Sequence, residues 1–170
     1  MHQLHPTLLR IVHAYTLISG VILLLITLIT SLNAMAFGAH KIAQMYGSSF
    51  PALSGYEDFV RLAISAAALM FLPYCQLQFG HIKIDLLEKK FSQKLNQYLD
   101  LLWILILFFT VLFLLYFMFF GLVESRSDGV ISSVLGWSEW FFYIPGMLSL
   151  SLWCSVLVGQ FIFLYKEVRV

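Results

Sequence analysis

Four long stretches of the chain contain no Asp, Glu, Lys or Arg, and short polar segments separate them. Each stretch is at least as long as the roughly 20 residues that a helix needs to cross a hydrocarbon core about 30 Å thick. A helix satisfies its own backbone hydrogen bonds, which lipid cannot do, and the residues do not alternate as barrel strands would. We therefore predict an all-α integral membrane protein with four transmembrane helices, near Ile11–Phe37, Tyr56–Phe79, Tyr98–Val123 and Ser138–Tyr165.

The segment between the second and third spans has a helical pattern of its own. Over residues 83–95 the apolar side chains recur three or four positions apart, and the lysines fall largely off that stripe. This spacing predicts a short amphipathic helix that lies in the cytoplasmic interface. Two roles are open for it: a surface helix that only joins two spans, or an arm that anchors the protein against lipid and a partner.

Composition supports a membrane protein and argues against several soluble classes. Of the 170 residues, 61% are apolar and 11% are charged, against about 45–50% and about 25% in soluble domains. The mean hydropathy is +0.88. With so few charged residues, the chain could not cover the surface of a free soluble enzyme. A net charge of +1 gives no electrostatic basis for binding nucleic acid. We expect a single membrane domain over residues 1–170.

Lysine and arginine are unevenly divided between the two ends of the predicted spans. With the N-terminus inside, seven of them lie on the inner side and three lie on or near the outer side. Short loops rich in Lys and Arg stay in the cytoplasm. Tyr and Trp also flank the predicted boundaries, as interfacial belts do. We therefore expect both termini to be cytoplasmic.

The polar side chains show no pattern typical of catalysis, metal binding or solute transport. Cys75 and Cys154 lie at predicted depths that differ by about 9 Å, so we interpret them as buried apolar residues rather than a disulfide. The histidines lie in the tail or near span ends, so we expect no haem and no metal. No ionisable residue lies centrally in a span, where ion-coupled carriers place carboxylates. We expect that the chain does not move a solute alone.

Three charged residues open the second span. Glu57 precedes Arg61 by four positions, which is the favourable orientation for an ion pair, and Asp58 lies beside them. One interpretation is an interfacial arginine that is paired within its own helix and reaches toward the headgroups. The other is a polar pin between helices or between subunits.

Small residues at helical spacing mark two possible packing surfaces. They are Ala63 and Ala67 on the second span, and Ser151, Ser155 and Gly159 on the fourth. Small residues at this spacing let helices approach closely in lipid, either within the chain or between chains. The third span is instead aromatic all round, which suits a lipid face or a partner's groove.

Prolines predict irregularities in two of the spans. Pro73 lies near the inner end of the second span, and Pro145 lies with Gly146 near the outer end of the fourth. Proline lacks an N–H donor and crowds the preceding turn of a helix. We expect kinks at both places rather than an unwound binding site.

Several motifs together resemble one known family. The run Gly80-His81-Ile82-Lys83-Ile84-Asp85 follows the second span, which opens with Glu57-x-x-x-Arg61. The fourth span opens with Gly136-Trp137-Ser138-Glu139-Trp140 and continues Tyr143-Ile144-Pro145-Gly146. This combination resembles the DctQ family, the small membrane subunit of tripartite ATP-independent periplasmic (TRAP) transporters. The resemblance runs from about Arg10 to Tyr165 and makes His81 and Asp85 candidate structural or partner contacts.

The resemblance implies a role without catalysis in a bacterial inner membrane. It implies two protein partners: a large multi-span subunit that carries the substrate and sodium sites, and a periplasmic binding protein that captures an organic acid. The small subunit would scaffold the large one, help to dock the binding protein, and hold no cofactor itself. The family's substrates include sialic acids and C4-dicarboxylates, and the overall pattern favours the sialic acid branch.

Two other classes of protein are alternatives. Four-helix membrane enzymes of the eicosanoid and glutathione type have a similar length and carry Glu and Arg in a second helix. This chain has no asparagine in its second span for a thiol cofactor, and its inner side offers mostly lysines. A small self-contained exporter would need a membrane-embedded Glu in its first span, and none lies between Arg10 and His40.

Overall fold

The computed structural model describes residues 5–47, 54–78 and 92–169, and over these residues the chain is all-α. Within them the only β pairing is an isolated bridge between Ile131 and Ser138. Four helical segments are long and apolar enough to cross a membrane, in agreement with the predicted number of spans. In order, the helices are α1 (Pro6–Met45), α2 (Tyr56–Met70), α3 (Leu72–Leu77), α5 (Gln93–Ser127), the 3-10 turn η1 (Glu139–Phe142) and α6 (Tyr143–Arg169).

The first helix is longer than the sequence pattern predicted. α1 starts with Pro6 in its first turn, where the missing N–H is not needed, and the ring of His5 accepts a hydrogen bond from the N–H of Thr7. It has 40 residues, which correspond to about 60 Å. The predicted end at Phe37 was therefore too early, because nothing breaks the helix before Gly47, whose φ is +75°.

The second span is interrupted, as Pro73 predicted. α2 ends at Met70, and α3 begins at Leu72 with the proline in its first turn. Pro73 has no N–H to donate to the carbonyl of Leu69, four residues earlier. The hydroxyl of Ser149 on α6 donates to that carbonyl at 2.6 Å. The break is thus satisfied by a neighbouring helix, as lipid-embedded backbone requires.

The prediction of a kink at Pro145 was wrong. Pro145 is the third residue of α6 and follows η1, so it lies in the first turn, where its N–H would have no helical partner. Its carbonyl accepts a hydrogen bond from the hydroxyl of Tyr15 at 2.6 Å. The proline therefore helps to start α6 and to fasten α1 to it.

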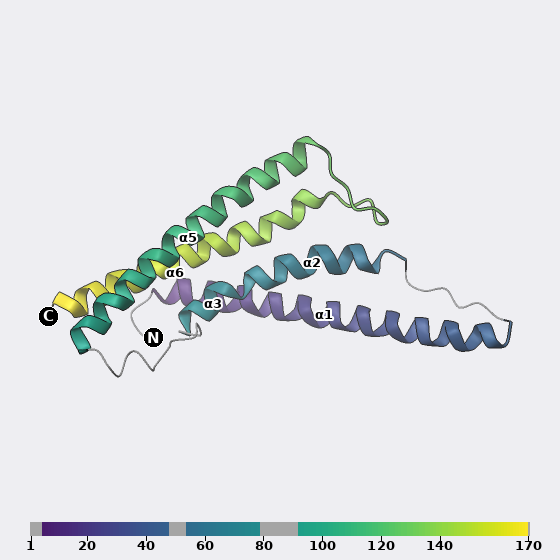
Figure 1. Ribbon diagram of the computed structural model, residues 1–170, viewed down its shortest axis with the longest axis horizontal. Helices are drawn as coiled ribbons and strands as arrows, with labels where there is room; N and C mark the ends of the chain where they lie inside the picture. Colours follow the sequence, from purple (N-terminus) through teal and green to yellow (C-terminus); the bar gives the residue numbers. More distant parts are fainter. Residues whose placement is uncertain (1–4, 48–53, 79–91, 170) are drawn as a thin grey trace.

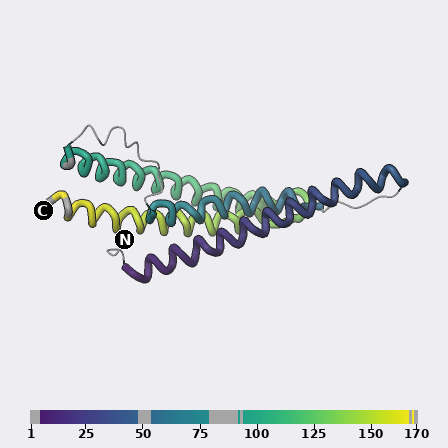
Figure 2. The backbone as a smooth tube through the Cα atoms, turned by 90° about the horizontal axis from the view of Figure 1, so that it is seen from below, coloured from purple at the N-terminus to yellow at the C-terminus, as the bar shows by residue number. Residues whose placement is uncertain are grey.

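The helices form two pairs that meet along α6. α1 packs on α2 and α3, α5 packs on α6, and α2 and α3 pack on α6. In Figure 1 the pairs lie close at the end that holds both termini and separate toward the other end. Figure 2 shows α1 reaching beyond the other helices at that far end. α6 is therefore the central helix, while α1 and α5 lie at the edges.

One apolar cluster joins the two helices of a pair, and a second joins one pair to the other. One lies between α5 and α6 and is built on Val111, Leu150 and Leu157. The other lies where α1, α3 and α6 meet, and it contains Val12, Leu77 and Val156. Burial is uneven, because only 17% of the most apolar window of α1 and 11% of that of α5 are covered within the chain. The edge helices thus keep wide apolar faces exposed.

Candidate functional site

Charged side chains from distant parts of the sequence meet at the end of the molecule opposite the termini. Arg61 of α2 and Glu139 of η1 form an ion pair between Nη2 and Oε1. The side chain of Arg61 is 56% exposed and that of Glu139 is 19% exposed. We refer to Asp58, Arg61 and Glu139 as the loop-end cluster. The pair joins the start of the second span to the start of the fourth.

Asp58 fixes the loop that leads into the fourth span. Its carboxylate accepts hydrogen bonds from the backbone N–H groups of Val134 at 2.7 Å and Leu135 at 3.2 Å. The residue is only 8% exposed. Gly55, with φ of +81°, lies directly under this loop, and a Cβ atom there would come within 2.7 Å of Leu135 Cδ2. A larger residue at position 55 would therefore be strained by the positive φ and would force the side chain of Leu135 to move.

The loop also has hydrogen bonds of its own. The N–H of Ser132 donates to the carbonyl of Trp137 at 2.9 Å, and the N–H of Trp137 donates to Ser132 Oγ at 3.1 Å. The N–H of Glu139 donates to the carbonyl of Val130 at 3.1 Å. These bonds and the contact with Asp58 give the loop one defined shape and hold Glu139 beside Arg61.

In the structure, Arg61 pairs with a residue outside its own helix. Its partner is Glu139, 78 residues away, rather than Glu57 one turn earlier on the same helix. Glu57 is exposed and accepts a hydrogen bond from the hydroxyl of Tyr56 at 3.2 Å. The ion pair therefore joins α2 to η1 within this chain, and Glu57 is not the partner of Arg61.

A second polar contact was not singled out from the sequence. Nε2 of Gln76 on α3 donates to Oε1 of Gln160 on α6 at 2.7 Å, and Nε2 of Gln160 donates to the carbonyl of Gln76 at 3.0 Å. Nε1 of Trp153 donates to Oε1 of Gln76 at 3.3 Å. All three residues are buried. Two glutamines 84 positions apart in apolar spans give no local signal that they meet.

Of the two predicted small-residue surfaces, one is buried within the chain and the other is exposed. Ala63 and Ala67 are buried, and the hydroxyl of Ser19 on α1 donates to the carbonyl of Ala67 at 2.7 Å. Their role is therefore packing within the chain. Ser151 and Ser155 are exposed, and each hydroxyl donates to the carbonyl four residues earlier on its own helix. With the half-buried Gly159 they form an outward-facing ridge on α6, which the chain itself does not use.

The inner connection lies largely outside the described residues. His81, Asp85 and most of the predicted amphipathic helix fall within residues 79–91, which are not described. The predicted end of that helix was wrong, because Lys94 and Leu95 belong to the first turn of α5. Cys75 and Cys154 are both free thiols. Across the described ranges, no three His, Cys, Asp or Glu side chains are grouped so that they could hold a metal ion.

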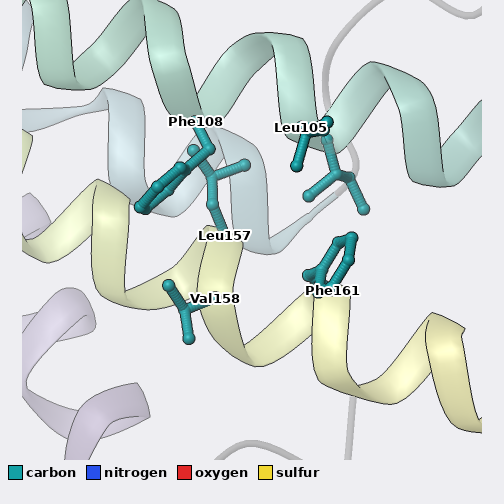
Figure 3. Close-up of a pocket in the computed structure, with 6 residues that line it drawn as sticks. Leu105, Phe108, Leu157, Val158 and Phe161 are labelled. Carbon is teal, nitrogen blue, oxygen red and sulfur yellow. The ribbon is translucent and has the colours of Figure 1, made fainter.

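The outer face of α5 and the groove between α5 and α6 are apolar. Exposed aromatic rings follow the outer length of α5, among them Phe109, Phe113 and Tyr116. A shallow groove of about 200 Å³ lies between α5 and α6, and Figure 3 shows Phe108 and Phe161 at its walls. Its lining has no polar side chain, so it offers no group that could bind or transform a polar substrate.

A family model for the DctQ component of tripartite ATP-independent periplasmic transporters matches residues 42–167. The chain belongs to the DctQ family. The match covers the loop-end cluster, α2, α3, α5 and all of α6 except its last two residues. Searches of curated proteins and of solved structures found no match to this chain.

Membership makes this DctQ protein a multi-pass membrane component of a TRAP transporter, as the sequence resemblance implied. Proteins of this family are transporter components, so membership favours a transporter subunit over a four-helix membrane enzyme. DctQ components work in general with a large membrane subunit and a periplasmic protein. The loop-end cluster fits such a component, since its carboxylates and arginine are engaged in holding helices and a loop together.

Proposed function

We propose that this DctQ protein is the non-translocating small subunit of a sodium-coupled TRAP transporter for an organic acid. Among the described residues of the four spans, every Asp, Glu, Lys and Arg lies near a helix end. Sodium and substrate binding at mid-membrane depth needs polar or charged ligands there. The proposal therefore assigns both sites to the large subunit, and it assigns scaffolding to this chain.

The ridge on α6 is the surface we propose for the large subunit. α6 is the central helix and buries its other sides against α5, α2 and α3. On its free side Ser151 and Ser155 present short side chains whose hydroxyls are already satisfied within the helix. Helices pack most closely in lipid where such small residues lie. This exposed ridge is the observation that carries the scaffold proposal.

Bulky substitutions test the ridge. Ser155→Phe is expected to prevent copurification of the large subunit, because a ring would hold the two helices apart. Leu102→Phe on the exposed face of α5 is the matched control and should leave copurification intact. If Leu102→Phe disrupts the complex and Ser155→Phe does not, the interface lies on α5 and the proposed surface is wrong.

The loop before η1 is the surface we propose for the periplasmic binding protein. Ile131 and Val134 at its tip are 60% and 62% exposed, and Asp58 holds the loop in place. The excess of positive charge near the termini supports a cytoplasmic location for them and a periplasmic one for this loop. Reporter fusions at Val170 and within Ser125–Ser133 should read inside and outside respectively. The reverse result excludes docking at this loop.

Transport assays test the whole proposal. The complex in vesicles should take up a carboxylate only with its periplasmic protein and a sodium gradient, and sialic acid is the substrate we expect over C4-dicarboxylates. The small subunit alone should take up neither. Val134→Asp should raise the concentration of periplasmic protein needed for half-maximal uptake while assembly is unchanged. Saturable sodium-driven uptake by this chain alone would refute the scaffold role.

A further inference from the structure

A cleft with a charged mouth and an apolar floor lies beside the loop-end cluster. Its volume is about 270 Å³, and it lies between α2, α5 and the η1–α6 segment. Figure 1 shows that these elements separate toward this end of the molecule. Its lining contains the charged Arg61 and Glu139 and the apolar Leu69, Met118 and Phe142. Because Arg61 lies near the start of α2 and Leu69 two turns further along, we call the charged end the mouth and the apolar end the floor. Pockets for whole small molecules are about 300–1,000 Å³, so this cleft suits part of a longer molecule.

The mouth lies at the depth where a span meets the headgroup region. It opens beside the first two turns of α2 and the start of η1. Trp137 lies in the loop before η1, and Trp140 lies in η1. The guanidinium of Arg126 lies 5.1 Å from the ring centre of Trp140. Trp and Arg gather at the membrane interface in this way. The cleft therefore has its charges at headgroup level and its floor toward the acyl chains.

The charges at the mouth complement a zwitterion. Nη2 of Arg61 binds Glu139, yet the Arg61 side chain is still 56% exposed, and a guanidinium carries five N–H donors. Exposed Glu57 lies outside the lining of the cleft, one turn before Arg61 on the same side of α2, where a headgroup that extends from the cleft would reach it. Arg61 therefore offers donors to a phosphate, and Glu57 accepts hydrogen bonds from an ammonium group. Asp58 is excluded from this role, since its carboxylate is engaged by the loop.

We propose that this cleft binds a phospholipid of the phosphatidylethanolamine class. Its phosphate lies on Arg61, its primary ammonium group lies on Glu57, and one acyl chain enters between α2 and α5 over Leu69 and Met118. Choline headgroups have no N–H donors and fit less well. The proposal needs only that the chain is embedded in a membrane, so it stands apart from the proposed scaffold role.

Photocrosslinking of the full-length chain in lipid nanodiscs tests the site. The probe is a phosphatidylethanolamine with a photoreactive diazirine in one acyl chain, in a phosphatidylcholine background. Label should concentrate on peptides that contain Leu69 and Met118. Arg61→Gln should lower that label about tenfold, as expected for loss of a charge-assisted hydrogen bond. Arg126→Gln removes a comparable interfacial charge outside the cleft and should leave the label unchanged.

Two further comparisons identify the headgroup. The same diazirine on phosphatidylcholine should label the cleft several-fold less, and Glu57→Gln should abolish that difference between the probes. Excess inorganic phosphate should not compete, because it has no chain to fill the floor. Competition by phosphate, or equal labelling by both probes in the wild type, overturns the phosphatidylethanolamine assignment.

A second pair of variants tests the cleft without touching its charges. Ser65 is exposed and lines the cleft, and its hydroxyl donates only within its own helix, to the carbonyl of Arg61. Ser65→Phe should fill the cleft and remove the label. Ala68→Phe places the same ring on an exposed position of α2 outside the cleft and should not. Equal labelling in all variants, or label spread evenly along the spans, shows only bulk lipid contact and overturns the proposal.

Discussion

The buried contact between Gln76 and Gln160 allows a quantitative test of what joins α3 to α6. Gln160→Leu removes two hydrogen bonds, one from Nε2 of Gln76 at 2.7 Å and one to the carbonyl of Gln76 at 3.0 Å. Hydrogen bonds between side chains of membrane helices contribute about 0.6 kcal/mol on average and up to about 1.7. Two such bonds, with a buried donor left unpaired, correspond to a loss of about 2 kcal/mol.

The double variant separates the direct contact from the rest. Gln76→Leu removes the same side-chain bond and also the acceptor of Trp153 Nε1, so we expect a similar loss of about 2 kcal/mol. Because the two single variants share one bond, Gln76→Leu with Gln160→Leu should be about 1 kcal/mol more stable than the sum of the single losses predicts. Leucine at both sites also leaves no amide unpaired in an apolar place.

The free energy of unfolding in bicelles, measured by steric trapping, provides the readout. Thr110→Val on the exposed face of α5 is the control, since its hydroxyl bonds only to the carbonyl of Ile106 in its own helix. It should change the free energy by less than about 0.5 kcal/mol. Additive losses in the double variant, or losses in the single variants no larger than the control, would show that the glutamines do not interact as described.

Substitutions at three further positions, Arg61, Asp58 and Gly146, test the part of the molecule near the loop. Arg61→Ala should lower the amount of assembled complex, while transport per assembled complex stays the same. Arg61→Lys should recover part of the assembly, because lysine can bind Glu139 but lacks the planar fork of arginine. Loss of transport in a fully assembled complex would count against a structural role. Asp58→Ala should destabilise the loop by about 2 kcal/mol and speed protease cleavage within residues 130–136, because two backbone N–H groups lose their acceptor. Gly146→Ala should lower stability by about 1 kcal/mol, because the new Cβ would overlap the end of Met118 and crowd Cδ1 of Leu69; shortening Met118 as well should recover only part of this loss.

The number and identity of the spans were predictable because lipid imposes them. A charge-free stretch of twenty or more residues has one stable form in a bilayer, so the pattern alone fixes the four helices. Lipid does not fix where a helix ends in water. α1 therefore runs past Phe37 to Met45, since no proline or left-handed glycine stops it earlier.

The contacts between distant helices could not be read from local spacing. Glu57 has the right offset from Arg61, yet Glu139 is the partner because the loop held by Asp58 brings η1 beside α2. Spacing likewise identified Ser151 and Ser155 as one surface without saying whether it faces inward. That depends on which sides of α6 the other helices occupy, and this is a property of the whole arrangement.

The proline break in the second span has a consequence for biogenesis. This span has the lowest hydropathy of the four, 1.5 against 1.9 to 2.8 for the others. The carbonyl that Pro73 leaves free and the amide of Gln76 both find their partners on α6, at Ser149 and Gln160. α6 follows both of these groups in the chain, so it leaves the ribosome after the second span. The second span therefore enters the bilayer with unmet polar groups, and the insertion machinery has to shelter it until α6 has been made. Truncation before α6 should leave a chain that quality-control proteases remove.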